Sequence, residues 1–273
     1  MLLHLGALVV AVAVLAPLGW SALASISSQA DLVARPFRWW PTAFTFDRYA
    51  EILTGVGGVG ETFRAAMLNS TIVAVATVVI AIIVGVLGAY AFARLRFRFR
   101  RPTLMVFLVS YMLPQVALLI PLYLILSTFG LLDTRLGLVV VNCSLVIPFT
   151  LWILSNYFVT IPQALEEAAR VDGTTRMGAL FRIVLPAARP GIFAAIMFSF
   201  LLAWDEFMYA LIFTSSDAAK TVPVAISEFA GRYTTDFGLV AAGGLIAAIP
   251  PVLIAVIFQR YVVSGMASGA VKG

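Results

Sequence analysis

The side chains that could do catalytic chemistry are few in this chain and lie far apart. It has one histidine, His4, near its N-terminus and one cysteine, Cys143, inside an apolar run. Nucleophilic catalysis needs a serine or cysteine beside a positioned base, and metal or disulfide chemistry needs clustered ligands or a second cysteine. The sequence therefore predicts no catalytic residues, no metal site and no enzyme activity.

A glycine-rich stretch has the form of a nucleotide-binding motif. Gly55, Gly57 and Gly60 satisfy the spacing G-x-G-x-x-G, and the run up to Thr62 approaches a phosphate-binding loop with Glu61 in the place of lysine. Such a fingerprint must follow a buried strand, and an acidic side chain would repel phosphate. A flexible glycine turn is the better interpretation.

The elements that must position any functional residues are hydrophobic helices long enough to cross a membrane. Hydrophobic residues make up 62% of the chain and charged residues 11%, whereas soluble domains are about a quarter charged. A helix needs about 20 apolar residues to cross a bilayer. We predict an all-α polytopic membrane protein with six spans, at about 2–24, 67–93, 103–127, 136–158, 190–214 and 239–261.

The distribution of charge indicates an orientation. Eleven of the 18 basic residues, but only three of the 13 acids, lie between spans two and three, between spans four and five, or after span six. These segments sum to +8 and the rest to −3, so the positive-inside rule predicts that they and both termini are cytoplasmic. The Arg94–Arg101 cluster is too short a link to read nucleic acid. The first span is long for a cleaved signal peptide, so we expect it to be retained.

A polar segment, at about 159–188, separates two of the hydrophobic runs. Pro162 suits the first turn of a helix and Gly173 suits its end. Thr174 or Thr175 could be the N-cap of a second helix. Residues at helical spacing then predict one apolar face for that helix: Met177, Leu180, Phe181 and Val184. We expect two short helices around a glycine turn.

This segment closely resembles the signature loop of the membrane permeases of binding-protein-dependent ABC importers. The resemblance lies in its spacing: Glu167-Ala168-Ala169, three residues, Gly173, nine residues, and Ile183-x-Leu185-Pro186. Most of the chain is similar to the carbohydrate (maltose-type) branch of that family. The further matching segments are Met112-Leu113-Pro114, Pro121-Leu122-Tyr123, Gly130-Leu131-Leu132-Asp133-Thr134, Gly137-Leu138, Trp204-Asp205-Glu206-Phe207 and Gly269-Ala270-Val271-Lys272-Gly273. The chain departs from the family in having almost no basic tail before its first span.

The resemblance implies a type I ABC importer permease fold and a division of labour. A second, related permease subunit would complete a heterodimer in the bacterial or archaeal plasma membrane, and two ATP-binding subunits would hold the ATP and magnesium. An extracytoplasmic solute-binding protein would deliver a sugar or oligosaccharide for alternating access. The same machinery for another solute (a glycerophosphodiester, polyamine or phosphate) and an ion-coupled secondary transporter are the alternatives.

The resemblance also assigns candidate site residues. The ATPase-coupling set is Glu166, Glu167, Ala168, Ala169, Asp172, Gly173, Ile183, Leu185 and Pro186. The candidate translocation path is Trp204, Asp205 and Glu206, and the candidate ATPase-interface residues in the cytoplasmic tail, 263–273, are Gly269, Lys272 and Gly273. Glu167 is expected to pair with a basic ATPase residue or with backbone amides of its own loop.

Asp205 and Glu206 are the only acids expected within a span, where a central acid costs about 2.5–3.5 kcal/mol. On a continuous helix adjacent residues project about 100° apart. We therefore expect one of them to line a polar path and the other to bond a polar group on a neighbouring helix. An interhelical hydrogen bond to the partner permease is the alternative.

The chain is predicted to form a single transmembrane domain, 1–273, with extracytoplasmic loops at about 25–66 and 215–238. Aromatic residues of the first loop could form an interfacial belt: Trp39, Trp40, Phe44, Phe46 and Tyr49. The second loop, by resemblance, is the better candidate to meet the binding protein. Prolines inside the spans are predicted to kink them: Pro114, Pro121, Pro148, Pro250 and Pro251.

Overall fold

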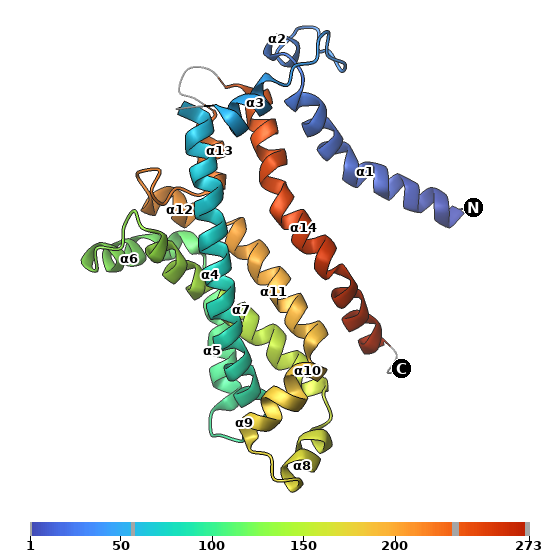
Figure 1. Cartoon of the computed structure of the whole chain (residues 1–273), viewed down its shortest axis with the longest axis vertical. Coiled ribbons are helices and arrows are strands. Elements are labelled where there is room, and N and C mark those ends of the chain that lie inside the picture. The colour runs from blue at the N-terminus through green and yellow to red at the C-terminus, as the bar shows by residue number, and fades with distance from the viewer. Residues whose placement is uncertain (1, 56–57, 231–234, 271–273) are drawn as a thin grey trace. The chain divides into compact units, whose positions relative to one another are not determined.

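The computed structural model describes residues 2–55, 58–230 and 235–270, with side chains from residue 3 to residue 261 within those ranges. The described residues are helical apart from turns and two isolated antiparallel bridges, Ser27↔Phe44 and Ala230↔Thr235. The longer helices are α1 (Leu2–Ser25), α4 (Gly58–Arg94), α5 (Arg100–Met112), α6 (Gln115–Thr128), α7 (Arg135–Thr160), α11 (Arg189–Trp204) and α14 (Phe237–Ala270) (Figure 1). The shorter ones are α2 (Gln29–Leu32), α3 (Asp47–Thr54), α8 (Gln163–Val171), α9 (Arg176–Ala179), the π-helical turn η1 (Leu180–Val184), α10 (Leu185–Ala187), α12 (Met208–Phe213) and α13 (Val222–Glu228).

Four helices of the described chain are long and apolar enough to cross a membrane: Leu3–Ser25, Gly58–Arg94, Arg135–Thr160 and Phe237–Tyr261. Two bent pairs bring the number to six if each pair is one span. Arg100–Met112 meets Gln115–Thr128 at 96°, and Arg176–Ala187 meets Arg189–Trp204 at 79°. The predicted all-α membrane fold is confirmed, with four candidate spans in the described chain, or up to six if each bent pair is one span.

The break between α5 and α6 corrects the predicted span at 103–127. Leu113 is extended, with ψ 136°, and Pro114 follows it as the N-cap of α6. Proline supplies no N–H and disfavours helical backbone in the residue before it. The expected kink at Pro114 is therefore a complete break.

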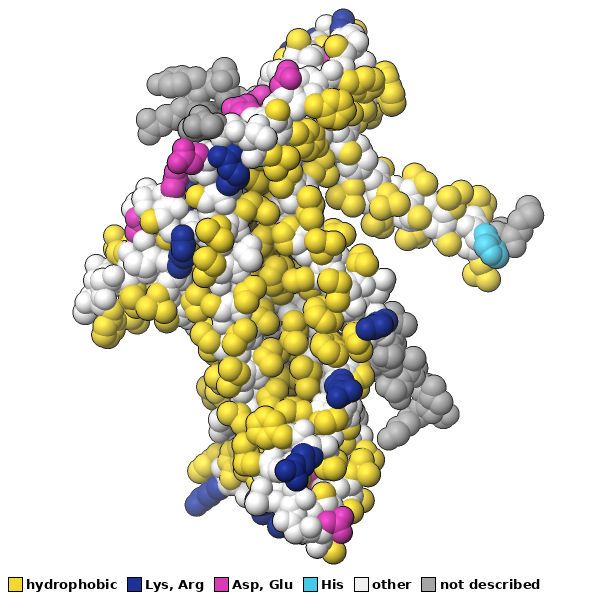
Figure 2. Space-filling model, viewed as in Figure 1, with side chains coloured by type: hydrophobic (Ala, Val, Ile, Leu, Met, Phe, Trp, Pro, Cys, Tyr) yellow, Lys and Arg dark blue, Asp and Glu magenta, His cyan; other side chains and the backbone are white. Residues whose placement is uncertain are grey.

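The chain divides into two compact units, which we describe separately. The first comprises residues 1–69 and 220–250. Its core joins α3, the start of α4, α13 and the start of α14 through Ile52, Phe63, Ala225 and Ala242, all almost fully buried. Residues 3–19 of α1 are exposed, and Figure 2 shows hydrophobic side chains along this helix.

The second unit comprises residues 70–219 and 251–273. Both α5 and α11 pack on α7. A Cβ at Gly88 of α4 would lie 2.5 Å from Leu151 Cδ1 of α7, so glycine allows these two helices to approach closely. A buried hydroxyl pair, Thr150 and Ser199, joins α7 to α11 at 2.8 Å. These contacts hold α4, α7 and α11 together within the second unit.

Candidate functional site

The signature loop has the conformation that its sequence predicts. Pro162 is the N-cap of α8, and the helix ends where Gly173 takes φ +86°. Thr174 N–H donates to the carbonyl of Ala169 at 3.0 Å and Gly173 N–H to that of Arg170 at 3.1 Å, which closes the helix end. Of the two possible N-caps for the second helix, Thr175 is the one used, accepting from Gly178 N–H at 3.1 Å. Two short helices around a glycine turn are confirmed.

The coupling residues divide into an exposed and a buried group. Glu167, Ala168, Asp172, Gly173 and Pro186 are exposed, Ala169, Ile183 and Leu185 are half-buried, and Glu166 is buried. The Glu167 side chain makes no hydrogen bond to any other described residue, so the loop's own amides are not its partner here. The exposed group is a surface that another protein can reach.

The apolar face predicted for the second helix is buried only in part. Leu180 and Val184 are fully buried in one core with Phe158, whereas Met177 and Phe181 are 49% and 58% exposed. Leu180 and Val184 lie on the edge of the apolar stripe that faces this core, and Met177 and Phe181 lie on the other edge. The helix therefore presents Met177 and Phe181 outward.

A buried ion pair links the end of α4 to α8 behind this surface. Arg94 Nε lies 3.2 Å from Glu166 Oε2, and the two side chains are 7% and 8% exposed. Arg94 also donates from its second terminal nitrogen to the Ile161 carbonyl at 2.8 Å, and the Tyr90 hydroxyl donates to the Arg176 carbonyl at 3.3 Å. The sequence predicts a role for Arg94 only in the orientation of the protein in the membrane. Its position at the end of a predicted span is the one sequence feature that could have indicated the ion pair.

The structure corrects the expectation that Asp205 and Glu206 lie on a continuous helix. α11 ends at Trp204, Asp205 is its C-cap, and α12 begins only at Met208. Glu206 is 7% exposed and accepts from Tyr209 N–H at 2.7 Å and Ala210 N–H at 3.0 Å. Its carboxylate thus satisfies amides of the first turn of α12 that have no helical acceptor. The two acids therefore do not lie on one helix, and the expected separation of about 100° between adjacent helical residues does not apply to them.

A cavity of about 540 Å³ lies in the second unit, beside the α5–α6 break and the α11–α12 break. It is lined by Tyr111 and Gln115 on either side of the α5–α6 break, by Phe149 of α7, and by Asp205 and Glu206. Trp204, expected on the path, is not part of this lining: it is 3% exposed and stacks on Phe200, with ring centroids 5.4 Å apart. Sequence reasoning found the two acids and missed the rings.

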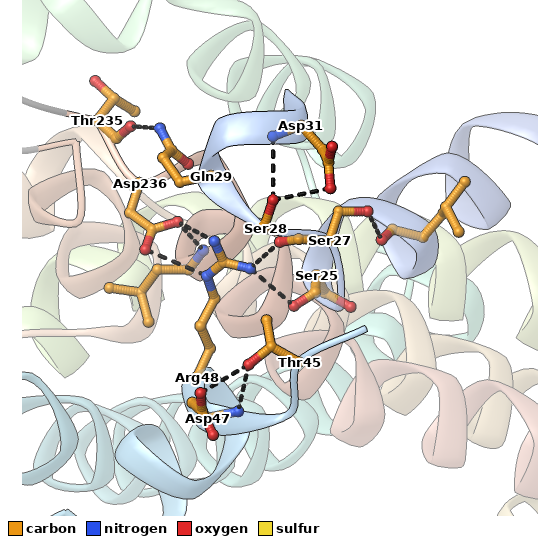
Figure 3. Close-up of polar contacts among 12 residues, drawn as sticks. Ser25, Ser27, Ser28, Gln29, Asp31, Thr45, Asp47, Arg48, Thr235 and Asp236 are labelled. Carbon is orange, nitrogen blue, oxygen red and sulfur yellow. Dashed lines mark hydrogen bonds and ion pairs between the residues drawn. The ribbon is translucent and has the colours of Figure 1, made fainter. Parts of the chain in front are cut away.

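A second buried arginine, Arg48 of α3, organises the first unit (Figure 3). Its guanidinium pairs with Asp236 at 3.0 Å and 3.2 Å and donates to the carbonyls of Ser25 and Ser27. Asp236 in turn accepts from Leu239 N–H at 3.0 Å, which caps the start of α14. The residues after α1 and before α14 are thereby joined through one side chain.

The carboxylate of Asp31 holds the segment that follows α2. It accepts from Thr42 N–H at 3.0 Å, from the Thr42 and Ser28 hydroxyls, and from Arg38 at 3.1 Å. These hydrogen bonds, that from the Thr42 amide above all, lower the pKa of Asp31 to about 2. The expected belt residues Trp39, Trp40, Phe44 and Phe46 are exposed, whereas Tyr49 is half-buried and bonds the Ser25 hydroxyl at 2.7 Å.

Asp133 ties the turn before α7 to the segment after α12. Its carboxylate accepts from the Ser215 and Ser216 amides at 2.9 Å and 3.1 Å and from the Ser216 hydroxyl at 2.7 Å. Burial raises the pKa of this carboxyl, but the hydrogen bonds outweigh burial and lower it overall. The sequence flagged Asp133 only as part of a family motif.

The expected ATPase-interface tail is largely outside the described part of the chain. Gly269 lies in α14, for whose last nine described residues the structure gives backbone only, and Lys272 and Gly273 are outside the described residues.

The class of protein is shown by comparison with known families. Residues 81–268 match the model of the binding-protein-dependent transport system inner membrane component. This range includes the signature loop, both bent helix pairs and the residues that line the cavity. The chain belongs to this family, so it is a multi-pass inner-membrane permease subunit of an ABC importer and not an enzyme.

Several relatives resemble the chain over most of its length. The sulfoquinovosyl glycerol transport system permease protein SmoH of Agrobacterium fabrum is 35% identical, over 94% of this chain and 88% of its own. The trehalose transport system permease protein SugB of Mycobacterium tuberculosis is 38% identical, over 85% and 84%. The trehalose/maltose transport system permease protein MalG of Thermococcus litoralis is 33% identical, over 100% and 96%.

Solved structures show the same fold. A chain of a bacterial ABC transporter involved in the import of the acidic polysaccharide alginate matches with a TM-score of 0.77 at 24% identity, over 95% of this chain and 94% of that one. A chain of the MetNI methionine ABC transporter in an inward-facing conformation matches with a TM-score of 0.59 at 21% identity, over 76% and 94%. The type I importer permease fold expected from the sequence is confirmed.

Proposed function

We propose that this permease moves a sugar or oligosaccharide, delivered by an extracytoplasmic binding protein, into the cytoplasm. The observation that carries the proposal comes from relatives in three organisms, each 33–38% identical over at least 84% of both chains. They are named as permeases for sulfoquinovosyl glycerol, trehalose and trehalose/maltose. A permease for a glycerophosphodiester, polyamine or phosphate remains the alternative.

The test is reconstitution of the permease with its partner permease, ATPase and binding protein in proteoliposomes. We expect uptake of a radiolabelled neutral disaccharide such as trehalose. The uptake should require ATP on the side of the membrane where the ATPase subunits lie. Uptake of glycerophosphodiester, spermidine or phosphate without any sugar uptake would contradict the sugar assignment and leave the importer class intact.

The partners and orientation belong to the same proposal. A second permease subunit completes a heterodimer, and two ATP-binding subunits carry ATP and magnesium on the side that the basic residues mark as cytoplasmic, with both termini there. The extracytoplasmic segment 215–238 meets the binding protein, and Asp205 and Glu206 lie on the translocation path. The single-domain organisation, 1–273, is proposed with it.

The coupling surface is the exposed part of the signature loop. ATPase closure can shift the permease between two states only through a differential interaction with them, and the exposed Glu167 beside the Gly173 turn offers such a contact. We expect Glu167→Lys and Gly173→Val to remain in the membrane and to lose transport, because the first reverses a charge and the second forces a β-branched residue into positive φ.

The measurement is ATP hydrolysis stimulated by loaded binding protein, together with uptake. Arg98→Glu is the matched control, since it reverses an exposed charge on the same predicted side but outside the loop. Normal stimulation in both loop variants would remove the coupling assignment.

The C-terminal tail is proposed to insert between the ATPase subunits, where small residues allow close approach and Lys272 can meet acidic groups. Deleting residues 269–273 should weaken assembly or uncouple hydrolysis from uptake. A fully active truncated transporter would show that the tail has no such role.

A further inference from the structure

The two adjacent acids at the α11–α12 break differ in what they can bind. Both carboxylate oxygens of Glu206 accept backbone N–H groups of α12. Asp205 is exposed and accepts no hydrogen bond from any other described residue. Of the two carboxylates that line the cavity, only that of Asp205 is available to a ligand.

The cavity has the size and position of a small-molecule site. Its volume of about 540 Å³ falls within the roughly 300–1,000 Å³ of ligand pockets. Non-helical backbone at membrane depth is tolerated where it is buried in protein or lines a water-filled cavity, and discontinuous helices form the substrate sites of many transporters. Here two such breaks, at Leu113–Pro114 and at Asp205–Phe207, border one cavity.

Aromatic rings line the same cavity as Asp205. Tyr111 and Phe149 stack with centroids 5.4 Å apart at 26°, and Phe198 meets Phe149 edge-on at 6.3 Å and 82°. All three rings line the cavity. The negative face of an aromatic ring attracts the C–H groups on the apolar face of a pyranose, while a carboxylate accepts hydrogen bonds from its hydroxyls. The combination suits one sugar ring.

The charge of the cavity limits which sugar ring that can be. No lysine, arginine or histidine is among the described residues that line it. An ionised Asp205 can only accept hydrogen bonds, so the carboxylate of a uronic acid would bring a second acceptor and a like charge. At about 5 Å and an effective dielectric constant of about 20, this repulsion weakens binding by roughly tenfold or more.

We propose that Asp205 is a specificity determinant of this cavity, which accepts a neutral or amino-sugar ring and rejects an anionic one. The inference rests on the proposed sugar-import function and adds the charge class of its substrate. Asp205 acts by direct contact with sugar hydroxyls and Tyr111 by stacking, while Glu206 holds the α12 turn that places Asp205.

The test uses glucose, glucosamine and glucuronate as probes, since glucose and glucuronate differ only at C6. Binding to the assembled transporter in nanodiscs, without binding protein, is measured by saturation-transfer NMR titration. We expect wild type to bind glucose and glucosamine and to bind glucuronate about tenfold or more weakly. Asp205→Asn should bring glucuronate to within about twofold of glucose. Asp47→Asn, at an exposed acid far along the chain from the cavity residues, should change nothing.

Two further variants keep the test decisive if Asp205→Asn does not assemble. Gln115→Lys places a cation in the same cavity and should also admit glucuronate, and Tyr111→Ala should weaken glucose and glucosamine alike. Equal binding of glucose and glucuronate by wild type, or an unchanged preference in an assembled Asp205→Asn transporter, overturns the inference. If Asp205→Asn does not assemble, an unchanged preference in Gln115→Lys overturns it.

The outcomes also separate the inference from the proposed function. A transporter that imports sugar but binds none of the three probes in this cavity retains its function and refutes the role of Asp205. A reconstituted transporter that imports no sugar refutes both.

Discussion

Two buried arginines hold two regions of this protein in different ways. In the first unit Arg48, 9% exposed, bonds Asp236 with two nitrogens and the carbonyls of Ser25 and Ser27 with a third. In the second unit Arg94, 7% exposed, has one carbonyl partner and one carboxylate, Glu166. Arg94 Nε and Glu166 Oε1 have no partner with hydrogen-bond geometry among the described residues.

The difference lies in what each arginine depends on. Asp236 is 41% exposed and also accepts from Leu239 N–H at the start of α14, so its charge does not depend on Arg48 alone and we expect Arg48 to act chiefly through the backbone carbonyls. Glu166 is 8% exposed and depends on Arg94 for its charge compensation. Burial alone therefore does not tell how an arginine stabilises a fold, because the exposure of its partner decides the cost of losing it.

The largest effect is expected for Arg94→Met. It leaves the carboxylate of Glu166 buried without a counter-charge, which costs about 3–5 kcal/mol, and should lower the melting temperature of the purified protein sharply. The double variant Arg94→Met with Glu166→Leu should recover most of the loss, since two apolar side chains can replace a buried pair. A double variant as unstable as Arg94→Met would show that Arg94 works mainly through the Ile161 carbonyl.

Arg48→Met should destabilise the first unit by about 2–3 kcal/mol, mostly because the carbonyls of Ser25 and Ser27 lose their donor. Adding Asp236→Asn should not restore stability, in contrast with the Arg94 pair. Arg38→Met is the matched control: its ion pair with Asp31 has a 55% exposed arginine, so we expect less than about 1 kcal/mol. Rescue of Arg48→Met by Asp236→Asn would erase the distinction between the two arginines.

Gly238→Ala tests the packing beneath the Arg48 clamp. An added Cβ would lie within van der Waals overlap of the Arg48 guanidinium carbon, so we expect a loss of about 1–3 kcal/mol. The loss should largely disappear in an Arg48→Met background. Gly244→Ala in the same helix has nothing within 4 Å of the new Cβ and should be neutral or slightly stabilising. Equal losses at both glycines would point to the helix rather than to Arg48.

The smallest effect concerns acid stability through Asp31. Its pKa is about 2 in the folded protein, well below the ordinary aspartate value of 3.8. Because the folded pKa is depressed, the stabilisation is fully present above about pH 4 and is lost as the pH falls toward 2. The difference in melting temperature between wild type and Asp31→Asn should shrink over that window. A difference that is constant from pH 5 to pH 2.5 would mean that the charge of Asp31 is not responsible.

Helix periodicity and turn chemistry predicted the signature loop well. Pro162, Gly173 and Thr175 act through the backbone of their own segment, and local rules suffice for them. The same rules failed at Asp205 and Glu206, because hydropathy continues through the α11–α12 break and shows no boundary there. They also failed for Met177 and Phe181, which are exposed although they share helical spacing with the buried Leu180 and Val184.

The sequence by itself determined the all-α membrane class, four continuous apolar helices and the signature loop, and it indicated the family by resemblance. The first three depend on composition, apolar run length and spacing within one segment, whereas the breaks in the spans predicted at 103–127 and 190–214 do not show in hydropathy. Only the tertiary structure decided the partners of Arg48, Arg94 and Asp133 and the cavity between the two helix breaks. The physical reason is that a side chain's partner comes from another segment: Arg48 and Asp236 are 188 positions apart, and no periodicity along the chain encodes which distant carbonyl or carboxylate a buried charge will meet.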